Sequence, residues 1–270
     1  MQSSLPVLLN TSEVEIWPAA LLRARSNRDA RVLARADHVL RRKRDGAYLA
    51  ATLPEGLMPL LPRWQRAPGL DEALATLEAW TARRAGGLGH GQSSLPPQGL
   101  DAKLDELGID ADDYAARTGL SRIDEPAWLV AAGVDRYRRP LWLLPGAARA
   151  WQDLRHAAAR DDVALDAVSG YRSHDYQLGI FERKRARGQD VAAILQVNAA
   201  PGFSEHHAGT ALDISAPGEP PAETSFESTP AFAWLTTHAA AHGFTMSYPR
   251  DNPHGIVYEP WHWRYRSALD

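Results

Sequence analysis

The segment that most constrains the structure reads Ser204-Glu205-His206-His207-Ala208-Gly209-Thr210-Ala211-Leu212-Asp213-Ile214. It places imidazoles and a carboxylate close together in a run that is otherwise mostly small and apolar. His206 and Asp213 are seven residues apart, which is too far for one helical turn. A loop that carries the histidine and a strand that carries the aspartate can still bring them together. Gly209 lies where such a loop needs a positive φ or a close backbone approach.

A second cluster, Glu259-Pro260-Trp261-His262, follows about fifty residues downstream. The proline interrupts any regular helix there, so a rigid turn can point both ionisable side chains into one cavity. Two imidazole nitrogens and one carboxylate oxygen, from His206, Asp213 and His262, can hold Zn²⁺ with its fourth position open. Glu259 can then take a proton from zinc-bound water as it attacks a carbonyl, and pass it to the leaving amine. The two clusters therefore predict a zinc peptidase.

Each residue of this set also has an ordinary interpretation. His207 could be the ligand in place of His206, or both could lie on the surface. Asp213 could cap a neighbouring turn. The combined set favours the metal site, because separately explicable residues fall at spacings that build one complete hydrolytic centre.

Composition narrows the classes of protein and of metal ligand. The chain has 270 residues, with 30 Lys and Arg against 33 Asp and Glu, and the net charge is -3. This balance gives no electrostatic reason to expect a nucleic-acid partner. The chain has no cysteine, so any zinc must bind to His, Asp or Glu.

Targeting signals give an expectation about the compartment. Residues 1–10 lack a basic leader and an apolar core of the length that a secretory signal needs. No stretch approaches the roughly 18 uninterrupted apolar residues of a membrane span. We therefore expect a cytoplasmic protein without a membrane span, or a periplasmic one if a leader has been removed.

The N-terminal region, residues 1–99, is expected to be mainly helical. Residues 17–44 carry apolar side chains at helical spacing with arginines on the other faces, and residues 71–84 show a second helical pattern. The basic face of 17–44 could meet an acidic polymer, but a solvated helix face is the more common case. Residues 86–99 are rich in Gly, Pro and Ser, which indicates a flexible linker.

The rest of the chain is expected to form a helical connecting segment, 100–140, and a catalytic domain, 141–270. In the connecting segment residues 100–118 look helical, and a further short element begins near residue 125. In the catalytic domain the patterns predict helices at 147–159, 176–187, 190–196 and 232–242, and strands at 163–168, 211–214 and 255–258. This order, without regular β-α-β repeats, favours an α+β fold.

Arg172 lies in the turn Ser169-Gly170-Tyr171-Arg172-Ser173, which follows the predicted strand 163–168. At the end of that strand its guanidinium would offer a fixed positive charge and several N–H donors. These donors suit a substrate carboxylate or the oxyanion that develops during peptide hydrolysis.

Four linked motifs over residues 141–265 resemble the VanY-type D-alanyl-D-alanine carboxypeptidases. They are the turn at 169–173, the stretch 204–213, Gly243-Phe244 with Ser247-Tyr248-Pro249, and Glu259-Pro260-Trp261-His262-Trp263-Arg264-Tyr265. The resemblance implies a zinc domain of the hedgehog and D,D-peptidase type with one Zn²⁺. It also implies cleavage of the last D-alanine from peptidoglycan stem peptides, so peptidoglycan peptides or muropeptides are the expected partners.

The resemblance also implies residue roles. The family pattern Ser-x-His-x-x-Gly selects His206 over His207, so the implied ligands are His206, Asp213 and His262, with Glu259 as the base. Arg172 is placed at the substrate carboxylate or the scissile carbonyl. The implied pocket residues are Ser173, Gln177 and Ser204.

Three functions are compatible with this pattern. A cytoplasmic location favours L,D-carboxypeptidase action on tetrapeptides over D,D-action on pentapeptides. An endopeptidase, cutting for example between L-Ala and D-Glu, would use the same zinc site. A zinc-containing module that only binds cell wall is the third, but it would have no need of Glu259. The oligomeric state and the purpose of residues 1–140 do not follow from the sequence.

Overall fold

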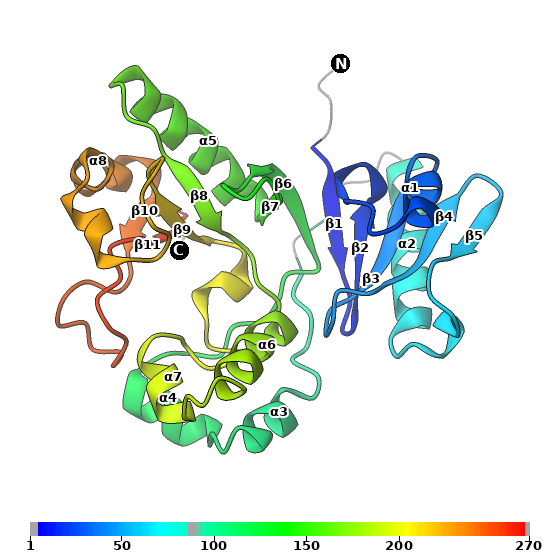
Figure 1. Ribbon diagram of the computed structural model, residues 1–270, viewed down its shortest axis with the longest axis horizontal. Helices are drawn as coiled ribbons and strands as arrows, with labels where there is room; N and C mark the ends of the chain where they lie inside the picture. Colours follow the sequence, from blue (N-terminus) through cyan, green and yellow to red (C-terminus); the bar gives the residue numbers. More distant parts are fainter. Residues whose placement is uncertain (1–4, 86–90, 92, 268–270) are drawn as a thin grey trace. The chain divides into compact units, whose positions relative to one another are not determined.

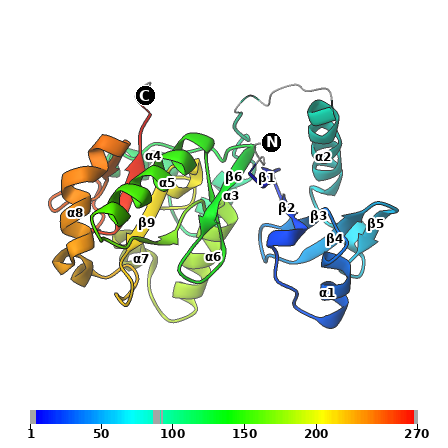
Figure 2. The ribbon, with the colours of Figure 1, turned by 90° about the horizontal axis from the view of Figure 1, so that it is seen from above.

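The computed structural model of the chain describes residues 5–85, 91 and 93–267. The chain divides into two compact units, which we describe separately (Figures 1 and 2). The first contains residues 1–98 and 125–130, and the second contains residues 99–124 and 131–270.

The first unit is built on an antiparallel sheet. Its strands follow one another in space as in sequence: β1 (Val7–Asn10), β2 (Val14–Pro18), β3 (His38–Arg42), β4 (Tyr48–Leu53) and β5 (Gly56–Pro59). The other edge of β1 pairs with β6 (Trp128–Val134), and β7 (Pro140–Leu143) follows β6 in the strand order, so residues distant in sequence extend this sheet.

Helices cover both faces of this sheet. Alternate residues of β3 point to opposite sides, as in any strand. Val39 packs in a cluster with Val32 of α1 (Asn27–Leu33), whereas Leu40 packs in another with Leu70 of α2 (Leu70–Ala85). Two short 3₁₀ turns, Ala19–Leu21 and Trp64–Arg66, complete the unit.

The prediction of a mainly helical N-terminal region is wrong, although the helix expected at 71–84 is confirmed by α2. The expected helix at 17–44 is in fact the end of β2, a 3₁₀ turn, the short α1 and β3. Val32 and Leu33 of α1 and Val39 and Leu40 of β3 fall by chance at helical spacing, although they belong to two separate elements. Their apolar side chains were therefore mistaken for one face of a single helix.

The predicted linker at 86–99 is only partly described. Residues 86–90 and 92 lie outside the described residues. Close to its end, Ser94 forms an isolated β-bridge with Pro126, and the Leu95 amide donates to the Glu125 carbonyl at 2.8 Å. The last residues of this stretch are thus hydrogen-bonded to the chain near residue 125.

The second unit contains a four-stranded antiparallel sheet. Its order is β10-β11-β9-β8, formed by β8 (Asp166–Ser169), β9 (Ala211–Ser215), β10 (Phe244–Met246) and β11 (His262–Tyr265). Before it in sequence come β7 (Pro140–Leu143) and α5 (Pro145–Arg160), and α8 (Pro230–His238) follows β9.

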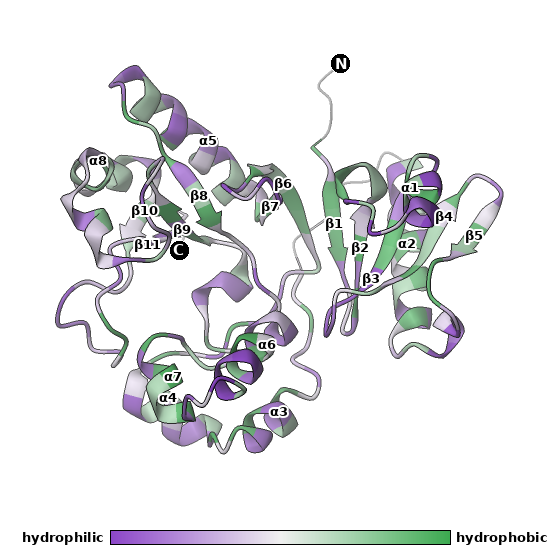
Figure 3. Ribbon diagram, viewed as in Figure 1, coloured by the Kyte–Doolittle hydropathy of each residue, from purple (hydrophilic) through white to green (hydrophobic). Residues whose placement is uncertain are grey.

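A second group of helices in this unit surrounds its own core (Figure 1). It comprises α3 (Leu100–Glu106), α4 (Ala111–Thr118), α6 (His174–Arg185) and α7 (Val191–Gln196). Phe181 of α6 and Phe203 are fully buried in this core, and the ring of Tyr114 from α4 packs on Phe203 at 4.9 Å between centroids. Figure 3 shows apolar colours along many of the strands.

The α+β class is confirmed in the second unit, and so are its four predicted helices, within a few residues at their ends. The expected helix at 100–118 is present as α3 and α4, but the connecting segment also contains all of β6, which is not helical. The strand predicted at 255–258 is wrong. That segment is irregular, and its Val257 amide donates to the Gln196 carbonyl of α7 at 2.9 Å rather than to a strand.

No helix in the described part of the chain combines the length and the hydropathy that a membrane crossing requires.

Candidate metal and peptidase site

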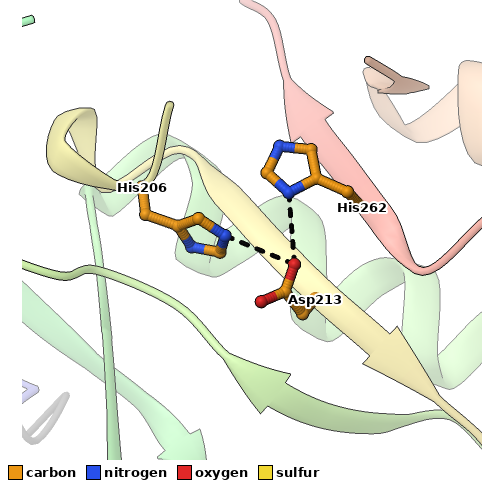
Figure 4. Close-up of side chains that lie close together, drawn as sticks. All are labelled: His206, Asp213 and His262. Atoms are coloured by element: carbon orange, nitrogen blue, oxygen red, sulfur yellow. Dashed lines mark hydrogen bonds and ion pairs between the residues drawn. The ribbon is translucent and has the colours of Figure 1, made fainter. Parts of the chain in front are cut away.

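The candidate site forms where β9 meets β11. Asp213 of β9 lies directly opposite His262 of β11 in the antiparallel register. His206 belongs to a 3₁₀ turn, Glu205–Ala208, that leads into β9. Gly209 ends this turn with φ +66°, the left-handed conformation that glycine adopts without strain, as its place in the sequence predicted. Figure 4 shows the two imidazoles converging on the Asp213 carboxylate.

The three side chains offer one ligand atom each around a common point. His206 Nε2 lies 3.3 Å from Asp213 Oδ1, and His262 Nδ1 lies 3.1 Å from the same oxygen (Figure 4). The three atoms lie within 4.8 Å of one another, and all three residues are buried. The predicted convergence of residues 206, 213 and 262 is therefore present.

Outer hydrogen bonds fix which nitrogen each imidazole presents. His206 Nδ1 lies 2.6 Å from the Gly170 carbonyl, so this nitrogen carries the proton and Nε2 is left as an acceptor. Within the described residues that buried Nε2 has no hydrogen-bond partner. A buried acceptor without a donor is costly, but it is the state that a metal ligand requires.

Burial and nearby charges also keep two of the residues in the protonation states that bind a metal ion. Burial, and then the nearby Arg172 guanidinium, lower the pKa of His206 to about 4, so its imidazole is neutral near pH 7. Burial opposes ionisation of Asp213, but His206, His262 and Arg172 together hold its pKa well below the usual value. Zinc binds these two forms, the neutral imidazole and the carboxylate.

His262 behaves differently because two carboxylates contact it. Burial alone would lower its pKa, but hydrogen bonds to Asp213 and Glu205 raise the pKa of His262 to about 10. Without a cation its Nδ1 therefore carries a proton toward Asp213. A metal ion that binds to Nδ1 must displace this proton.

Glu205 is the site residue that the sequence interpretation missed. Its Oε2 accepts from His262 Nε2 at 2.9 Å, and its Oε1 accepts from Arg264 Nη1 at 2.9 Å. Burial would raise its pKa, but these two partners lower it to about 2. The available signal was a carboxylate directly preceding the proposed ligand, yet only the fold shows that it reaches the other histidine.

Glu259 lies beside the three-residue cluster without belonging to it. Its Oε2 is 3.9 Å from His262 Nδ1, and the residue is 8% exposed. Burial raises the pKa of Glu259 to about 7, with His262 opposing the shift and Asp213 adding to it. A carboxyl group poised near neutral pH can both accept and donate a proton.

Arg172 brings positive charge to the same place. Its Nη2 lies 3.8 Å from Asp213 Oδ2, and its Nε is buried without a hydrogen-bond partner among the described residues. The backbone anchors it, since the Arg172 amide donates to the His206 carbonyl at 3.3 Å. The Arg172 guanidinium therefore has an N–H donor available for a substrate.

The structure separates the two adjacent histidines. His207 Nδ1 lies 2.6 Å from the Arg172 carbonyl, and its Nε2 accepts from the Gly202 amide at 3.1 Å. Both ring nitrogens are thus used to hold the loops together. It is His206, not His207, that faces Asp213.

A cavity of about 270 Å³ adjoins the cluster. Beside the residues already described, its lining includes Gln177, Lys184, Ser204, Tyr248 and Trp261. Two predicted pocket residues, Gln177 and Ser204, are thus in place. The third, Ser173, does not line it, because its hydroxyl accepts from the Tyr176 amide at 3.1 Å and caps α6.

This arrangement is that of a metallopeptidase site. Two imidazoles and one carboxylate form a three-ligand set that leaves a coordination position open. A glutamate suited to act as a base stands next to it, and an arginine can stabilise negative charge. The cavity gives a substrate access to all of them.

Comparison with known proteins agrees with this class. The family model of VanY, D-alanyl-D-alanine carboxypeptidase, matches residues 141–268. The bifunctional D-Ala-D-Ala dipeptidase and D-Ala-D-Ala carboxypeptidase VanXYC of Enterococcus gallinarum is 31% identical over 152 residues, which are 54% of this chain and 77% of that protein. The chain belongs to the VanY family of D-alanyl-D-alanine carboxypeptidases. Its second unit is accordingly a domain of the D,D-peptidase type.

Other relatives are similar over a smaller share of their length. A D-alanyl-D-alanine carboxypeptidase of Enterococcus faecalis is 36% identical over 124 residues, which are 42% of this chain and 44% of that protein. A solved structure of the LD-carboxypeptidase LdcB is 37% identical, with a TM-score of 0.43, and the match covers 46% of this chain and 59% of that one. The chain thus spans less than half of the length of this enterococcal relative.

Proposed function

We propose that the protein is a zinc-dependent carboxypeptidase that removes the terminal D-alanine from peptidoglycan stem peptides. The observation that carries the proposal is the convergence of His206 Nε2, Asp213 Oδ1 and His262 Nδ1 within 4.8 Å of one another. Membership of the VanY family supports the substrate class, since D-alanyl-D-alanine carboxypeptidase is the activity for which the family is named.

The residues present fit a zinc ion. The buried and unpartnered Nε2 of His206 is an acceptor without a donor, and the donor set contains only nitrogen and oxygen atoms that zinc accepts. His206, Asp213 and His262 would hold the ion. When bound, zinc polarises the scissile carbonyl and lowers the pKa of a water molecule, which makes it a nucleophile near neutral pH.

The protein's own groups supply the proton transfers. Glu259, with its pKa raised to about 7 by burial, accepts a proton from the attacking water and delivers it to the nitrogen of the leaving D-alanine. Arg172 lies beside the three-residue cluster, with its Nη2 3.8 Å from Asp213 Oδ2. From there its guanidinium donates hydrogen bonds to the scissile carbonyl oxygen as that oxygen gains negative charge. The same N–H groups would serve the other role that the sequence predicts for Arg172, which is binding a substrate carboxylate. Gln177 and Ser204, which line the cavity, are proposed to contact the substrate.

Digestion of defined substrates tests the proposal. Zinc-loaded protein is incubated with muropeptides that carry a tetrapeptide or a pentapeptide stem, and released D-alanine is followed by mass spectrometry. Release from the tetrapeptide indicates L,D-specificity, and release from the pentapeptide indicates D,D-specificity. The absence of release from both, with zinc bound, would refute the proposal. Cleavage between L-Ala and D-Glu would show an endopeptidase instead.

The cytoplasmic location remains a prediction of the sequence. It would direct the activity to recycled muropeptides or wall precursors. A reporter fusion to the intact chain, compared with one to a secreted control, locates the protein directly.

A further inference from the structure

A second cation in the active-site cavity has no part in the chemistry described so far. Lys184 lies near the end of α6, is half-buried, and lines the same cavity as Arg172 and Glu259. Within the described residues its ammonium group has no hydrogen bond or ion pair. Burial lowers its pKa, and the charge of Glu259 opposes this shift. Burying part of an ammonium group is costly unless hydrogen bonds compensate, and a ligand that binds to Lys184 would supply them.

The helix sets the distance of Lys184 from the reacting groups. Gln177 and Lys184 both line the cavity and are seven residues apart on α6. Seven residues are about two turns, which puts the two side chains on one helix face and about 10 Å apart along the axis. Figure 3 shows polar colours along α6. Because α6 begins two residues after Arg172 and ends at Arg185, Lys184 lies at the far end of the cavity's α6 wall.

This distance indicates which part of a substrate Lys184 meets. A carboxypeptidase releases one residue, so the terminal carboxylate lies within about one residue length, about 3.5 Å, of the scissile bond. With Arg172 serving the scissile carbonyl, a lysine anchored two helical turns beyond Gln177 is better placed for a group farther from the scissile bond than that carboxylate. It faces the retained part of the peptide, upstream of the cleaved bond.

We propose that Lys184 is a specificity-determining residue that binds a free carboxylate of the stem peptide upstream of the scissile bond. This inference rests on the proposed carboxypeptidase function and adds the substrate feature that is recognised. Two sources share this chemistry. One is the side-chain carboxylate of a diaminopimelate residue at the third stem position, and the other is the α-carboxylate of a γ-linked D-glutamate at the second.

Paired substrates separate these sources. Replacing diaminopimelate by lysine removes one carboxylate and leaves the rest of the residue intact, and amidation of the D-glutamate α-carboxylate neutralises the other. We expect the wild-type enzyme to prefer the acidic member of one pair by about 10-fold in kcat/KM, the size of one charge pair in a partly buried site.

Three variants connect this preference to Lys184. Lys184→Gln should lose the preference, with kcat/KM reduced for the acidic peptide and nearly unchanged for its neutral counterpart, whereas Lys184→Arg should retain it. The matched control is Arg185→Gln, which removes one positive charge from an exposed neighbour on the same helix that does not line the cavity. Its preference should equal that of the wild type, which distinguishes direct binding from long-range attraction.

The possible failures are distinct. If zinc-loaded wild-type protein releases D-alanine from no peptide, the proposed function itself is wrong. If it releases D-alanine but does not distinguish acidic from neutral peptides, or if Lys184→Gln retains the distinction, the role of Lys184 is overturned. An equal loss on both members of each pair would also overturn it, because that result indicates a structural role or contact with the terminal carboxylate.

Discussion

Each histidine of the site is useful because of the ring nitrogen that it presents. The Gly170 carbonyl holds His206 Nδ1 at 2.6 Å, and Glu205 holds His262 Nε2 at 2.9 Å, so opposite types of nitrogen face the same carboxylate. Such outer partners orient ligands before any ion binds. The site is therefore preorganised by groups that do not themselves coordinate.

Glu259→Gln tests the proton transfers. The substitution preserves the shape of the side chain but removes its basicity. We expect zinc content, measured by mass spectrometry of the metal, to stay at the wild-type level while kcat falls by about 10²- to 10⁴-fold. Glu227→Gln, at a glutamate that pairs with Arg250 away from the cavity, serves as the control. Wild-type turnover in Glu259→Gln would exclude Glu259 as the base.

Glu205→Gln tests the outer partner that the sequence interpretation missed. The amide cannot hold His262 through a charged acceptor, so Nδ1 should be a weaker ligand. We expect zinc affinity to fall by about 10- to 100-fold, as measured by competition with a chelating dye. Unchanged affinity would mean that Glu205 only positions Arg264.

The pKa of Glu259 predicts the pH dependence of activity. Below its pKa of about 7 the carboxyl is protonated and cannot accept a proton. We therefore expect kcat/KM of the zinc-loaded enzyme to fall on acidification with a midpoint below about 7, because the positive charge of the ion favours the carboxylate. The residual activity of Glu259→Gln should lack this acid limb. An increase of kcat/KM on acidification would contradict the assignment.

Among the secondary-structure elements, β9 and β11 matter most, because their pairing fixes the site. Asp213 and His262 are directly opposite, and a shift of the register by one residue would turn one of them to the other face. Gly209 ends the turn before β9 with a positive φ, and Gly170 after β8 leaves room for Leu141 and Trp142. The position of the site residues thus depends on two glycines.

Gly170→Ala tests this dependence. A Cβ at position 170 would lie 2.8 Å from Leu141 Cδ1 and 3.1 Å from the Trp142 carbonyl oxygen, both closer than ordinary contacts. We expect a loss of about 1–3 kcal/mol in the free energy of unfolding and weaker zinc binding, since the Gly170 carbonyl orients His206. Chemical denaturation and zinc competition measure the two effects.

Gly146→Ala is the matched control. Gly146 lies in α5, and a Cβ added there would meet its nearest neighbour, Tyr265 Cε1, at an ordinary contact distance of 3.4 Å. It should be neutral, or stabilising by up to about 1 kcal/mol. Equal stability losses in the two variants would show that the tight packing around Gly170 has no special importance.

The sequence predicted helices better than strands. Helices such as α2 and α5 have one polar face, so their period is visible in the residues. The strand β3 is covered on both faces by helices, so its adjacent Val39 and Leu40 are both buried and show no alternation that marks a strand. The irregular segment 255–258 was misassigned for the same reason, since Ile256 is buried without belonging to a sheet.

At the scale of the whole molecule, the candidate site belongs to one unit. All residues that line the cavity lie in residues 131–270. The first unit contains the strands β1 to β5, with helices on both faces of their sheet, and a buried ion pair between Lys43 and Glu125. The chain returns to this unit at 125–130, which no local sequence signal predicted. The convergence of His206, Asp213 and His262 could be predicted because their spacing and the family resemblance single them out, whereas the contact of Glu205 with His262 required the tertiary structure.

Location of the metal tests the central claim most directly. Crystals of zinc-loaded protein, measured on both sides of the zinc absorption edge, give an anomalous difference map that shows only zinc. We expect one peak in the second unit, about 2.0–2.2 Å from His206 Nε2, an oxygen of Asp213 and His262 Nδ1. A peak bound by other residues, or none at these three side chains, would contradict the account.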